Sequence, residues 1–600
     1  MVFTKHFRKY YFIYAPLLLL GIAVLLVVDY FQLMIPEVTR DIIGIYRVSW
    51  ETYELLGPGS IISKDMLTKI LPLIGQMGIL LAIVASGRFF WRYFIFGTSR
   101  KIEEDIRNEM FAHSTKLPNS YYSKEKVGGL MTYFINDLQA VRMAFGPGLM
   151  MVVDGLFLGI LTLVKMFRIH VMLTVYAFIP LVALGILMFF LRKSMQLKFR
   201  ERQKSFEEMS DFVQENISGI AVIKAYVKEA ASAFRFKKRT EDFHEKNIEF
   251  VKKRLIFQIA ITIAVNLVMF TLIGYGSYIV IYGGFEAEVL FEYITYFGIL
   301  TWPVMALVRF ITISSQASAS ASRIGEFLDT EIDINDDLAV ETPELKGSIS
   351  AKNLSFSYPD DPNTLILDDI SFEINEGEMV GILGRTGSGK STLVDLFLRV
   401  YNVDLASLYV DGNDIMTIPL FQLRDSIGYV PQDNFLFSDT IRANIGFSQL
   451  EINDEVITDA AKMSDVYGNI VEFKEGFNTV LGERGVTVSG GQKQRISIAR
   501  ALAKDPKILI LDDSVSAVDT KTEEAIIKNL RQVRKNKTTI LIAHRISTVR
   551  NMDKIILLEK GRLVDIGSHN ELLKRSNLYQ EMVRLQALHR LEEEGGGDNA

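Results

Sequence analysis

The chain of 600 residues is too long for a single hydrophobic core, so the sequence predicts at least two domains. Its formal net charge of -5 gives no reason to expect nucleic-acid binding. The absence of cysteine excludes disulfide bonds, thiolate metal sites and cysteine catalysis.

Residues 1–325 contain several long apolar runs, and the first of them follows Lys5, Arg8 and Lys9 like the core of a signal peptide. This run, from residue 12 to residue 34, is too long for a signal core. It ends in Met34-Ile35-Pro36-Glu37, which lacks the small residues of a cleavage site. We therefore predict a retained first membrane span.

Six apolar segments contain the roughly 20 residues that a helix needs to cross a bilayer. The predicted spans are residues 12–34, 70–95, 146–167, 171–192, 256–282 and 290–314. Basic side chains concentrate in the stretches 96–144 and 193–254, which places these stretches in the cytoplasm. Six spans put both chain ends on the same side. The sequence therefore predicts a multi-pass protein of the cell (plasma) membrane with a cytoplasmic N-terminus.

The two long cytoplasmic stretches have a helical composition and period, so we expect them to extend the membrane helices as antiparallel pairs. Each pair is expected to end in a short tip, near residues 119–129 and residues 217–229. Contact between these tips and a nucleotide domain is the favoured interpretation, and simple solvated helices are the alternative.

Ionisable residues inside the spans are candidates for lining a cavity, because a charge in hydrocarbon is costly without a partner or water. Those toward the span ends, which snorkelling or helix-end solvation explains, are Asp29, Arg88, Arg92, Lys165 and Glu292. Asp154 and Arg309 lie deeper. Arg309, Trp302 and Met305 are the candidates for a substrate cavity, although ordinary helix packing also produces aromatic and methionine-rich faces.

The acidic and poorly periodic residues 326–345 are predicted to be a linker, and residues 346–588 an α/β domain. In that domain the apolar strand 379–383 leads into Gly384–Ser391, which spells the phosphate-binding motif G-x-x-x-x-G-K-S and opens a helix. Backbone N–H groups of such a loop bind the phosphates of ATP or GTP together with the helix N-terminus. The predicted nucleotide-binding residues of this P-loop are Gly384, Arg385, Thr386, Gly387, Ser388, Gly389, Lys390, Ser391 and Thr392.

A second acidic element completes a site for Mg²⁺ and ATP. The apolar strand 508–511 ends in Asp512, which is the Walker-B arrangement. Lys390 is expected to reach the β- and γ-phosphates, Ser391 to ligate Mg²⁺, and Asp512 to help hold the ion through water. Capping of the next helix by Asp512 is the alternative.

Together with the membrane half, these motifs make the chain similar to a known protein family over nearly its whole length. It resembles an ABC transporter of the exporter type: six spans with long cytoplasmic helix extensions, then an α/β P-loop ATP-binding cassette. The most specific mark is the signature Val488-Ser489-Gly490-Gly491-Gln492, which differs from the family's L-S-G-G-Q only in its first residue. The resemblance implies that Val488, Ser489, Gly490, Gly491 and Gln492 bind the ATP held by a second chain's P-loop. One such chain is then half a transporter.

The resemblance also assigns roles to other residues, one at a time. Tyr358 falls where the family stacks an aromatic ring on adenine, and Gln432 resembles the Q-loop residue that senses Mg²⁺ and the attacking water. Residues 479–485 resemble the loop that touches the coupling helices, and residues 516–519 resemble the D-loop. His544 resembles the switch histidine near the γ-phosphate.

The chain departs from the family pattern at Asp513, where the family normally has the glutamate that positions the attacking water. Aspartate is one methylene shorter, which withdraws the carboxylate by about 1.5 Å. A misplacement of about 1 Å in a positioning group costs on the order of 10²-fold in rate. The site, with Asp513, His544 and Gln432 as its catalytic residues, is therefore expected to bind ATP but to hydrolyse it poorly.

This departure resembles the degenerate subunit of heterodimeric bacterial multidrug exporters. The expected function is ATP-driven export of hydrophobic or amphipathic compounds, drugs or lipids, with a different second chain that carries the Walker-B glutamate. The alternatives are a homodimeric lipid or peptide exporter and an ATP-gated regulatory membrane protein. The acidic and glycine-rich residues 589–600 are predicted to be a disordered tail.

Overall fold

The computed structural model describes residues 5–56, 62–125, 127–482, 485, 487–516 and 518–595. Residue contacts divide the chain into two compact units. The membrane unit comprises Met1–Met110 and Met131–Leu328, and the cassette unit comprises Phe111–Leu130 and Asp329–Ala600.

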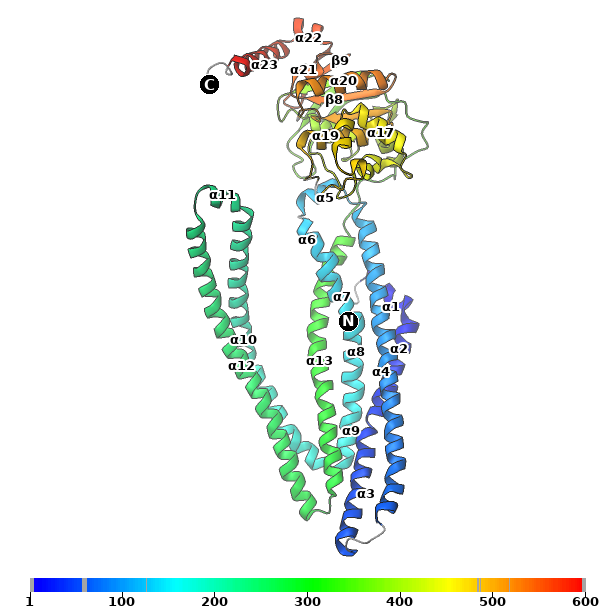
Figure 1. The fold of residues 1–600 in the computed structure, drawn as a ribbon, viewed down its shortest axis with the longest axis vertical. Coiled ribbons are helices and arrows are strands. Elements are labelled where there is room, and N and C mark those ends of the chain that lie inside the picture. Colours follow the sequence, from blue (N-terminus) through cyan, green and yellow to red (C-terminus); the bar gives the residue numbers. More distant parts are fainter. Residues whose placement is uncertain are drawn as a thin grey trace. The chain divides into compact units, whose positions relative to one another are not determined.

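The membrane unit is built of long helices (Figure 1). Six helices in the described residues are long and apolar enough to cross a membrane, which confirms the prediction of six spans: Ala15–Glu51, Met66–Ser114, Gly128–Ile169, Val171–Ser218, Glu229–Tyr282 and Ala287–Leu328. The elements are α1 (Arg8–Ile13), α2 (Ala15–Gln32), α3 (Ile35–Leu56), α4 (Ile62–Ser114), α6 (Val127–Thr132), η1 (Tyr133–Asp137), α7 (Leu138–Met143), η2 (Ala144–Gly148), α8 (Leu149–Val153), η3 (Asp154–Leu158), α9 (Gly159–Ile169), α10 (Val171–Ser218), α11 (Ile220–Ala225), α12 (Glu229–Tyr282) and α13 (Ala287–Leu328).

The hairpin of α10 and α12 shows why these helices extend beyond a bilayer. α10 has 48 residues, which at 1.5 Å per residue gives a length of about 70 Å, against a hydrocarbon core of about 30 Å. The two helices lie side by side, and the short α11 joins them at the tip (Figure 1). The side chains of Val222 and Tyr226 at this tip are exposed.

Buried polar side chains in the membrane unit pair with one another, as an apolar surrounding requires. The Tyr293 hydroxyl donates to the Thr174 hydroxyl at 2.8 Å. Glu292 is only 2% exposed and forms an ion pair with Arg40 at 2.9 Å. The expectation that Glu292 snorkels from a span end is therefore wrong, because α3 brings a basic partner to this buried carboxylate.

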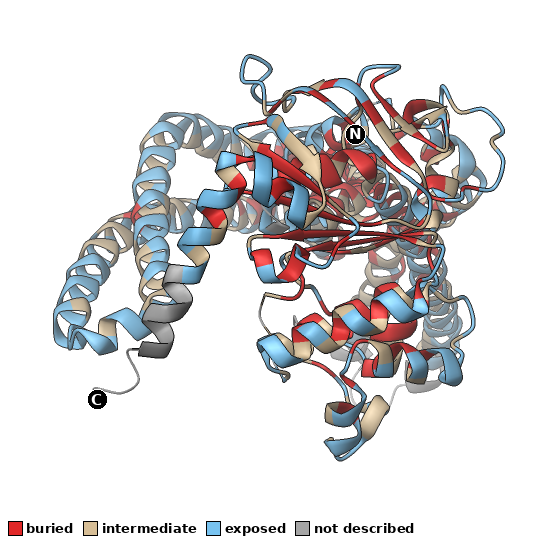
Figure 2. Ribbon diagram, turned by 90° about the horizontal axis from the view of Figure 1, so that it is seen from above, coloured by how far each residue is buried: buried red, intermediate tan, exposed pale blue. Residues whose placement is uncertain are grey.

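Two sheets frame the cassette unit. The six-stranded sheet has the order β10-β9-β3-β8-β7-β6, and the antiparallel four-stranded sheet has the order β2-β1-β4-β5. Strands β3, β7 and β8 are buried along their whole length, as is typical of parallel strands covered on both faces; Figure 2 shows them as a red layer. The strands are β1 (Ile349–Phe356), β2 (Leu367–Ile374), β3 (Met379–Gly384), β4 (Leu408–Val410), β5 (Asn413–Asp414), β6 (Ile427–Val430), β7 (Ile508–Asp512), β8 (Thr538–Ala543), β9 (Lys554–Glu559) and β10 (Arg562–Gly567).

Helices cover the sheets of the cassette unit, so the α/β domain expected after the membrane half is confirmed. They are α5 (Asn119–Lys124), α14 (Lys390–Phe397), α15 (Leu420–Ser426), α16 (Ile441–Ile445), α17 (Asp454–Met463), α18 (Tyr467–Glu472), α19 (Gly490–Ala503), α20 (Thr520–Val533), α21 (Ile546–Val549), α22 (His569–Arg575) and α23 (Asn577–Gly595), with 3₁₀ turns η4 (Ile415–Thr417), η5 (Gly446–Ser448) and η6 (Gly476–Asn478).

Helix α23 extends into the predicted tail. The expectation of disorder from residue 589 is wrong as far as Gly595, where the helix ends. Leucine and glutamate are strong helix formers, and Leu591-Glu592-Glu593-Glu594 continue the helix before the glycines begin. Residues 596–600 lie outside the described part of the chain.

The first predicted tip, residues 119–129, contacts the nucleotide domain within the cassette unit. Lys124 on α5 forms an ion pair with Asp360 at 2.5 Å. The Asn119 side chain forms a hydrogen bond with the Tyr401 hydroxyl. These contacts agree with the interpretation that this tip meets the nucleotide domain.

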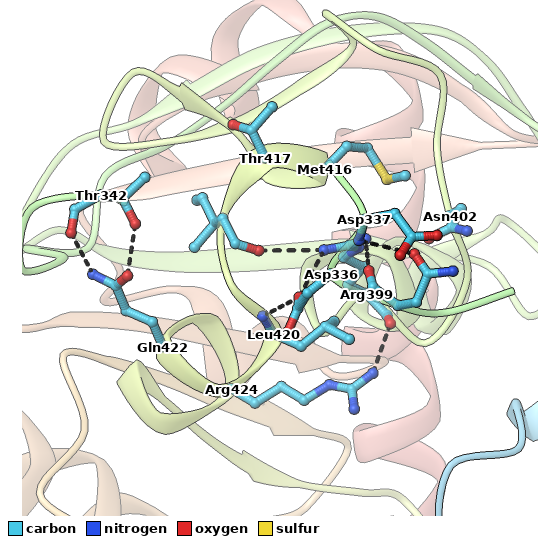
Figure 3. A network of polar contacts seen from close by, with 12 residues as sticks. Asp336, Asp337, Thr342, Arg399, Asn402, Met416, Thr417, Leu420, Gln422 and Arg424 are labelled. Atoms are coloured by element: carbon cyan, nitrogen blue, oxygen red, sulfur yellow. Dashed lines mark hydrogen bonds and ion pairs between the residues drawn. The ribbon is translucent and has the colours of Figure 1, made fainter. Parts of the chain in front are cut away.

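The predicted linker is fixed to the cassette by a buried arginine (Figure 3). Arg399 is 2% exposed and donates to the carbonyl oxygens of Asn335 at 2.6 Å and Ile418 at 3.2 Å. Nearby, the Thr342 hydroxyl donates to the Gln422 side chain at 2.6 Å. This part of the linker therefore folds as a component of the cassette unit.

Replacing Arg399 by methionine is expected to detach the linker. The variant keeps the apolar volume but leaves buried carbonyl groups without donors, which costs about 2–4 kcal/mol of unfolding free energy. Thermal unfolding and limited digestion of residues 326–345 by a glutamate-specific protease, which can cut after Glu331, Glu341 and Glu344, measure this. Arg442→Met is the control, because that arginine is more exposed than Arg399 and forms a surface ion pair with Asp454 and a long hydrogen bond to the Ile452 carbonyl oxygen, at 3.3 Å. Equal behaviour of the two variants contradicts the assignment.

Candidate functional site

The parallel strands collect the predicted nucleotide residues at one edge of the six-stranded sheet. β3 pairs in parallel with β8, β8 with β7, and β7 with β6. Gly384 ends β3, Asp512 ends β7, His544 directly follows β8, and Gln432 lies two residues after β6. The carboxyl ends of parallel strands share one edge, so residues far apart in the sequence meet there.

The P-loop has a backbone that only its glycines permit. Gly387 and Gly389 have φ values of 77° and 92°, in the left-handed region that favours glycine. A Cβ on Gly384 would collide with the Leu558 carbonyl oxygen and the Ser388 hydroxyl. α14 begins directly after the loop, and its N-terminus supplies free N–H groups.

The side chain of Lys390, the first residue of α14, is buried against the P-loop backbone. Its Nζ donates to the carbonyl oxygens of Gly384 at 2.9 Å and Arg385 at 3.1 Å. Burial lowers the pKa of its ammonium group. The Ser388 hydroxyl is also buried and has no hydrogen-bond partner in the described part of the chain. A buried cation, an unsatisfied hydroxyl and a helix N-terminus fit the phosphate oxygens of a nucleotide.

Asp512 and Ser391 form a pair of oxygen donors that could hold Mg²⁺. Asp512 is buried and accepts a hydrogen bond from the Ser391 side chain. Burial raises the pKa of the Asp512 carboxyl and neighbouring Asp513 raises it further, whereas Ser391, Lys390 and His544 act in the opposite direction. A hydroxyl beside a carboxylate is what a P-loop site offers to Mg²⁺, so the residues present fit this ion.

Tyr358 lies beside the start of α14. Its hydroxyl is 2.8 Å from the Thr392 hydroxyl, and its ring meets the Tyr401 ring edge-on at a centroid distance of 5.2 Å. The half-buried ring therefore flanks the P-loop helix, in a position where an adenine ring bound near the loop can stack on it.

The main chain holds Asp513 firmly. Its φ is 46°, a left-handed conformation that aspartate tolerates better than most residues. Its N–H donates to the Ile542 carbonyl oxygen at 3.0 Å. Its carbonyl oxygen accepts from the Gln494 amide at 3.1 Å and the Ser516 hydroxyl at 2.8 Å. With the backbone fixed, the reach of the carboxylate depends on side-chain length.

The signature residues lie at the start of α19. Ser489 caps this helix, and Gln492 bonds back to the Ser489 N–H at 3.0 Å, which forms a capping box. Ser489 and Gly490 are exposed, and a Cβ added to Gly490 would meet no atom within 4 Å. In the described residues no hydrogen bond or ion pair joins the signature to the P-loop of the same chain. The structure therefore leaves the signature open to another molecule.

Sequence reasoning missed Gln586 on α23. Its side-chain amide donates to the His544 carbonyl oxygen at 2.6 Å and accepts from the Ile546 N–H at 2.7 Å. On the same helix Glu581 forms an exposed ion pair with Arg385 of the P-loop at 3.3 Å. The C-terminal helix thus holds the histidine loop, and no motif marks this contact because it is purely tertiary.

Removing the Gln586 amide is expected to slow hydrolysis without loosening ATP. In Gln586→Ala the His544 segment loses both bonds. Misplacement of a catalytic group by a fraction of an ångström is expected to lower the hydrolysis rate at this chain's own ATP site about tenfold, measured in a complex whose other ATP site has been inactivated. The KM for ATP is expected to stay unchanged in steady-state ATPase assays. Gln580→Ala is the control, since among the described residues that side-chain amide bonds only to the Leu573 carbonyl oxygen. An equal loss in both variants, or a change in KM alone, speaks against the positioning role.

One of the three predicted substrate residues faces a cavity. A cavity of about 750 Å³ in the membrane unit is lined by Trp302, whose indole N–H donates to the Asp154 carboxylate at 2.9 Å. Arg309 and Met305 are exposed and do not line it. Arg309 lies about two helical turns further along α13, beyond the reach of this cavity.

The chain matches two family descriptions, "ABC transporter transmembrane region" over residues 18–304 and "ABC transporter" over residues 367–516. It is 37% identical over 525 residues to YheI of Bacillus subtilis, described as a probable multidrug resistance ABC transporter ATP-binding/permease protein, across 87% of this chain and 90% of the relative. It is 31% identical over 588 residues to the multidrug resistance-like ATP-binding protein MdlA of Escherichia coli, across 98% and 95%. The structure of a bacterial Atm1-family ABC exporter with ATP bound has the same fold, with a TM-score of 0.73 and 24% identity over 97% of this chain and 98% of that chain.

Proposed function

Because the chain belongs to the ABC transporters, as an exporter with fused transmembrane and ATP-binding domains, we propose that it is the weakly hydrolytic half of a heterodimeric multidrug exporter. Its general activity is ATP-driven export. The multidrug names of YheI and MdlA favour drugs as the cargo. Hydrophobic or amphipathic compounds, including lipids, are the proposed class.

Asp513 is the observation that carries the heterodimer proposal. It lies where a family member of full activity has glutamate. Its main chain is held by one hydrogen bond to a backbone carbonyl oxygen and two from side chains. The shorter carboxylate cannot be moved toward the phosphates by a small backbone shift. ATP binding remains intact, since Lys390, Ser391 and Asp512 are all in place.

In this proposal the two chains contribute differently to the two ATP sites, because the exposed signature of this chain can bind ATP held by the partner. Val488–Gln492 would complete the site of the partner, whose own P-loop and Walker-B glutamate hydrolyse ATP. The P-loop of this chain would hold ATP against the partner's signature. A chain with an intact signature and a shortened base fits this asymmetric arrangement.

The nucleotide residues take the following roles in this proposal. Ser391 and Asp512 would hold Mg²⁺, with Gln432 as a further candidate ligand, and the ion would neutralise phosphate charge. Lys390 binds the β- and γ-phosphates, and Tyr358 stacks on adenine. Asp513 accepts a proton from the attacking water.

The membrane arrangement is proposed from the charge distribution. The stretches 96–144 and 193–254 carry the basic residues and face the cytoplasm, as does the cassette. The chain is then a multi-pass protein of the cell membrane. Closure of the cassettes on ATP would be transmitted through the tips near residues 119–129 and 217–229.

A homodimeric exporter is the alternative in the same class, with Asp513 as a slow base in both sites. A regulatory membrane protein is the alternative in another class, in which ATP binding switches conformation without pumping. Substrate-stimulated ATPase in vesicles, compared with passive flux of the same compound, separates pumping from gating.

Photolabelling of the natural complex tests the heterodimer. The chain is purified from its native membranes with its partner and exposed to radioactive 8-azido-ATP and Mg²⁺, with and without vanadate. We expect this chain to be labelled without vanadate, as a holding site, and the partner to be trapped only with vanadate. Recovery of a single chain species, or equal vanadate-dependent trapping in two species, contradicts the proposal.

A further inference from the structure

The 750 Å³ cavity of the membrane unit has two carboxylates in its wall. Asp29 on α2 is 3% exposed and Asp154 at the start of η3 is 6% exposed. Neither Asp29 Oδ2 nor Asp154 Oδ1 accepts a hydrogen bond from any described residue. The expectation that helix-end solvation explains Asp29 is therefore wrong, since α2 buries this side chain against the cavity.

The unpaired carboxylate oxygens call for a cationic partner. A buried charge within a membrane span is costly unless it is paired, so such groups mark binding sites and pathways. The second oxygen of Asp154 is held by the Trp302 indole at 2.9 Å, which orients the free oxygen. No ion pair joins Asp29 or Asp154 to a basic residue in the described part of the chain.

The two arginines that line the same cavity form no ion pair with either carboxylate in the described residues, although Arg88 interacts electrostatically with both at longer range. Arg88 donates to the Gln32 side chain at 3.1 Å. The Arg92 guanidinium lies 5.3 Å from the Trp91 ring centroid. Both arginines are exposed, whereas the two carboxylates are buried. The buried charged groups of the cavity wall are therefore the two carboxylates, while the basic groups that line it remain exposed.

The remaining wall suits an apolar, aromatic-rich ligand. Trp91, Phe96 and Trp302 contribute rings, among mostly aliphatic side chains. Aromatic faces attract organic cations in addition to burying apolar surface. A volume of about 750 Å³ lies within the range of pockets for drug-sized molecules.

We propose that this cavity is a binding site for lipophilic cations, with Asp29 and Asp154 as the counter-charges and the indole rings as the apolar wall. The inference rests on the proposed export function and names the class of compound exported. It concerns the membrane unit alone, so it does not depend on which chain hydrolyses ATP.

The charge preference is tested with two probes of equal shape. Tetraphenylphosphonium and tetraphenylborate are nearly isosteric ions of opposite charge. Each is titrated into the purified full-length chain in detergent, with tryptophan fluorescence as the readout. Two of the three tryptophans in the chain, Trp91 and Trp302, line the cavity. We expect saturable quenching by the phosphonium and at least about tenfold weaker binding of the borate.

Two variants assign the binding to the carboxylates. Asp29→Asn and Asp154→Asn are each expected to weaken phosphonium binding about tenfold, since each removes one charge and keeps the shape. Glu292→Gln is the matched control, because Glu292 is equally buried but paired with Arg40 outside the cavity. Binding of a fluorescent ATP analogue checks that each variant is folded.

Each outcome decides the proposal. Equal binding of the two ions, or unchanged phosphonium binding in both aspartate variants, overturns it. Tighter binding of the borate overturns it in favour of an anion site at Arg88 and Arg92. If a variant does not fold, the two ions are still compared on the unchanged chain, and their relative affinities support or overturn the cation site. A failed photolabelling experiment leaves this result standing, and the reverse also holds.

Discussion

Replacing Asp513 by glutamate is expected to raise the hydrolysis rate of this chain's own ATP site by about 10²-fold. The added methylene returns the carboxylate by about 1.5 Å toward the attacking water, and a shift of that size is worth about two orders of magnitude. The left-handed φ of 46° is energetically less favourable for glutamate than for aspartate. The hydrogen bonds of Asp513 with Ile542, Gln494 and Ser516 are nevertheless expected to keep the backbone in this conformation. Phosphate release from the purified complex measures the rate.

Two further sets of variants test whether the length of the side chain at position 513 limits the hydrolysis rate. Asp513→Asn keeps the short side chain but removes the base, and we expect it to hydrolyse no faster than the natural chain. Each variant is also assayed with Gly490→Asp in the same chain, which is expected to silence the partner's site and leave only the site of Asp513. ATP affinity is expected to be unchanged in all of them. An unchanged rate in Asp513→Glu means that Asp513 does not limit this site.

Gly490→Asp is expected to reduce the total ATPase of the complex by about 10²-fold. A carboxylate at the start of α19 would face the phosphates of the ATP held by the partner, and loss of one preorganised donor alone costs about 10² in rate. The same substitution is harmless to this chain's fold. A side chain at Gly490 meets open space, and a negative charge at a helix N-terminus is stabilising.

The comparison with Lys390→Ala tells the two sites apart. This variant is expected to lose ATP at the chain's own site while retaining more of the total ATPase than Gly490→Asp does. In a homodimer every site contains both residues, so both variants would abolish activity. Gly490→Ala is the size control, and we expect it to keep most of the rate. Full activity of Gly490→Asp would contradict the placement of the signature in the competent site.

The contiguous parts of the nucleotide site are predictable from sequence because their chemistry is local. Gly384–Ser391 forms its loop through glycine backbone angles and an adjoining helix N-terminus, and the structure shows both. Asp512 follows an apolar strand, and parallel pairing of β7 with β8 carries it to the edge where Gly384 and His544 lie. The six spans are predictable for a related reason, since bilayer thickness sets helix length directly.

Polar partners across long sequence distances are not predictable in this way. Gln586 bridges His544 and Ile546, and Arg40 pairs with Glu292, yet neither pair has a spacing or motif. A buried polar group is satisfied by whichever donor folding brings near it, and one chain offers many equivalent amides and arginines. The same reason explains why the sequence favours Arg309 for the cavity and a helix end for Asp29.

The six-span half and the P-loop follow from the amino-acid sequence alone, because each depends on consecutive residues or on a fixed period. The signature and the proposed short base at Asp513 follow from the resemblance of consecutive residues to the family pattern. Three other features emerge only when the chain folds: α23 holds the histidine loop, Arg399 fastens the linker, and Asp29 and Asp154 share a cavity. Those outcomes depend on which faces of separate helices pack together. The helix faces that pack together are determined by the fit of whole surfaces, and no local pattern of residues predicts them.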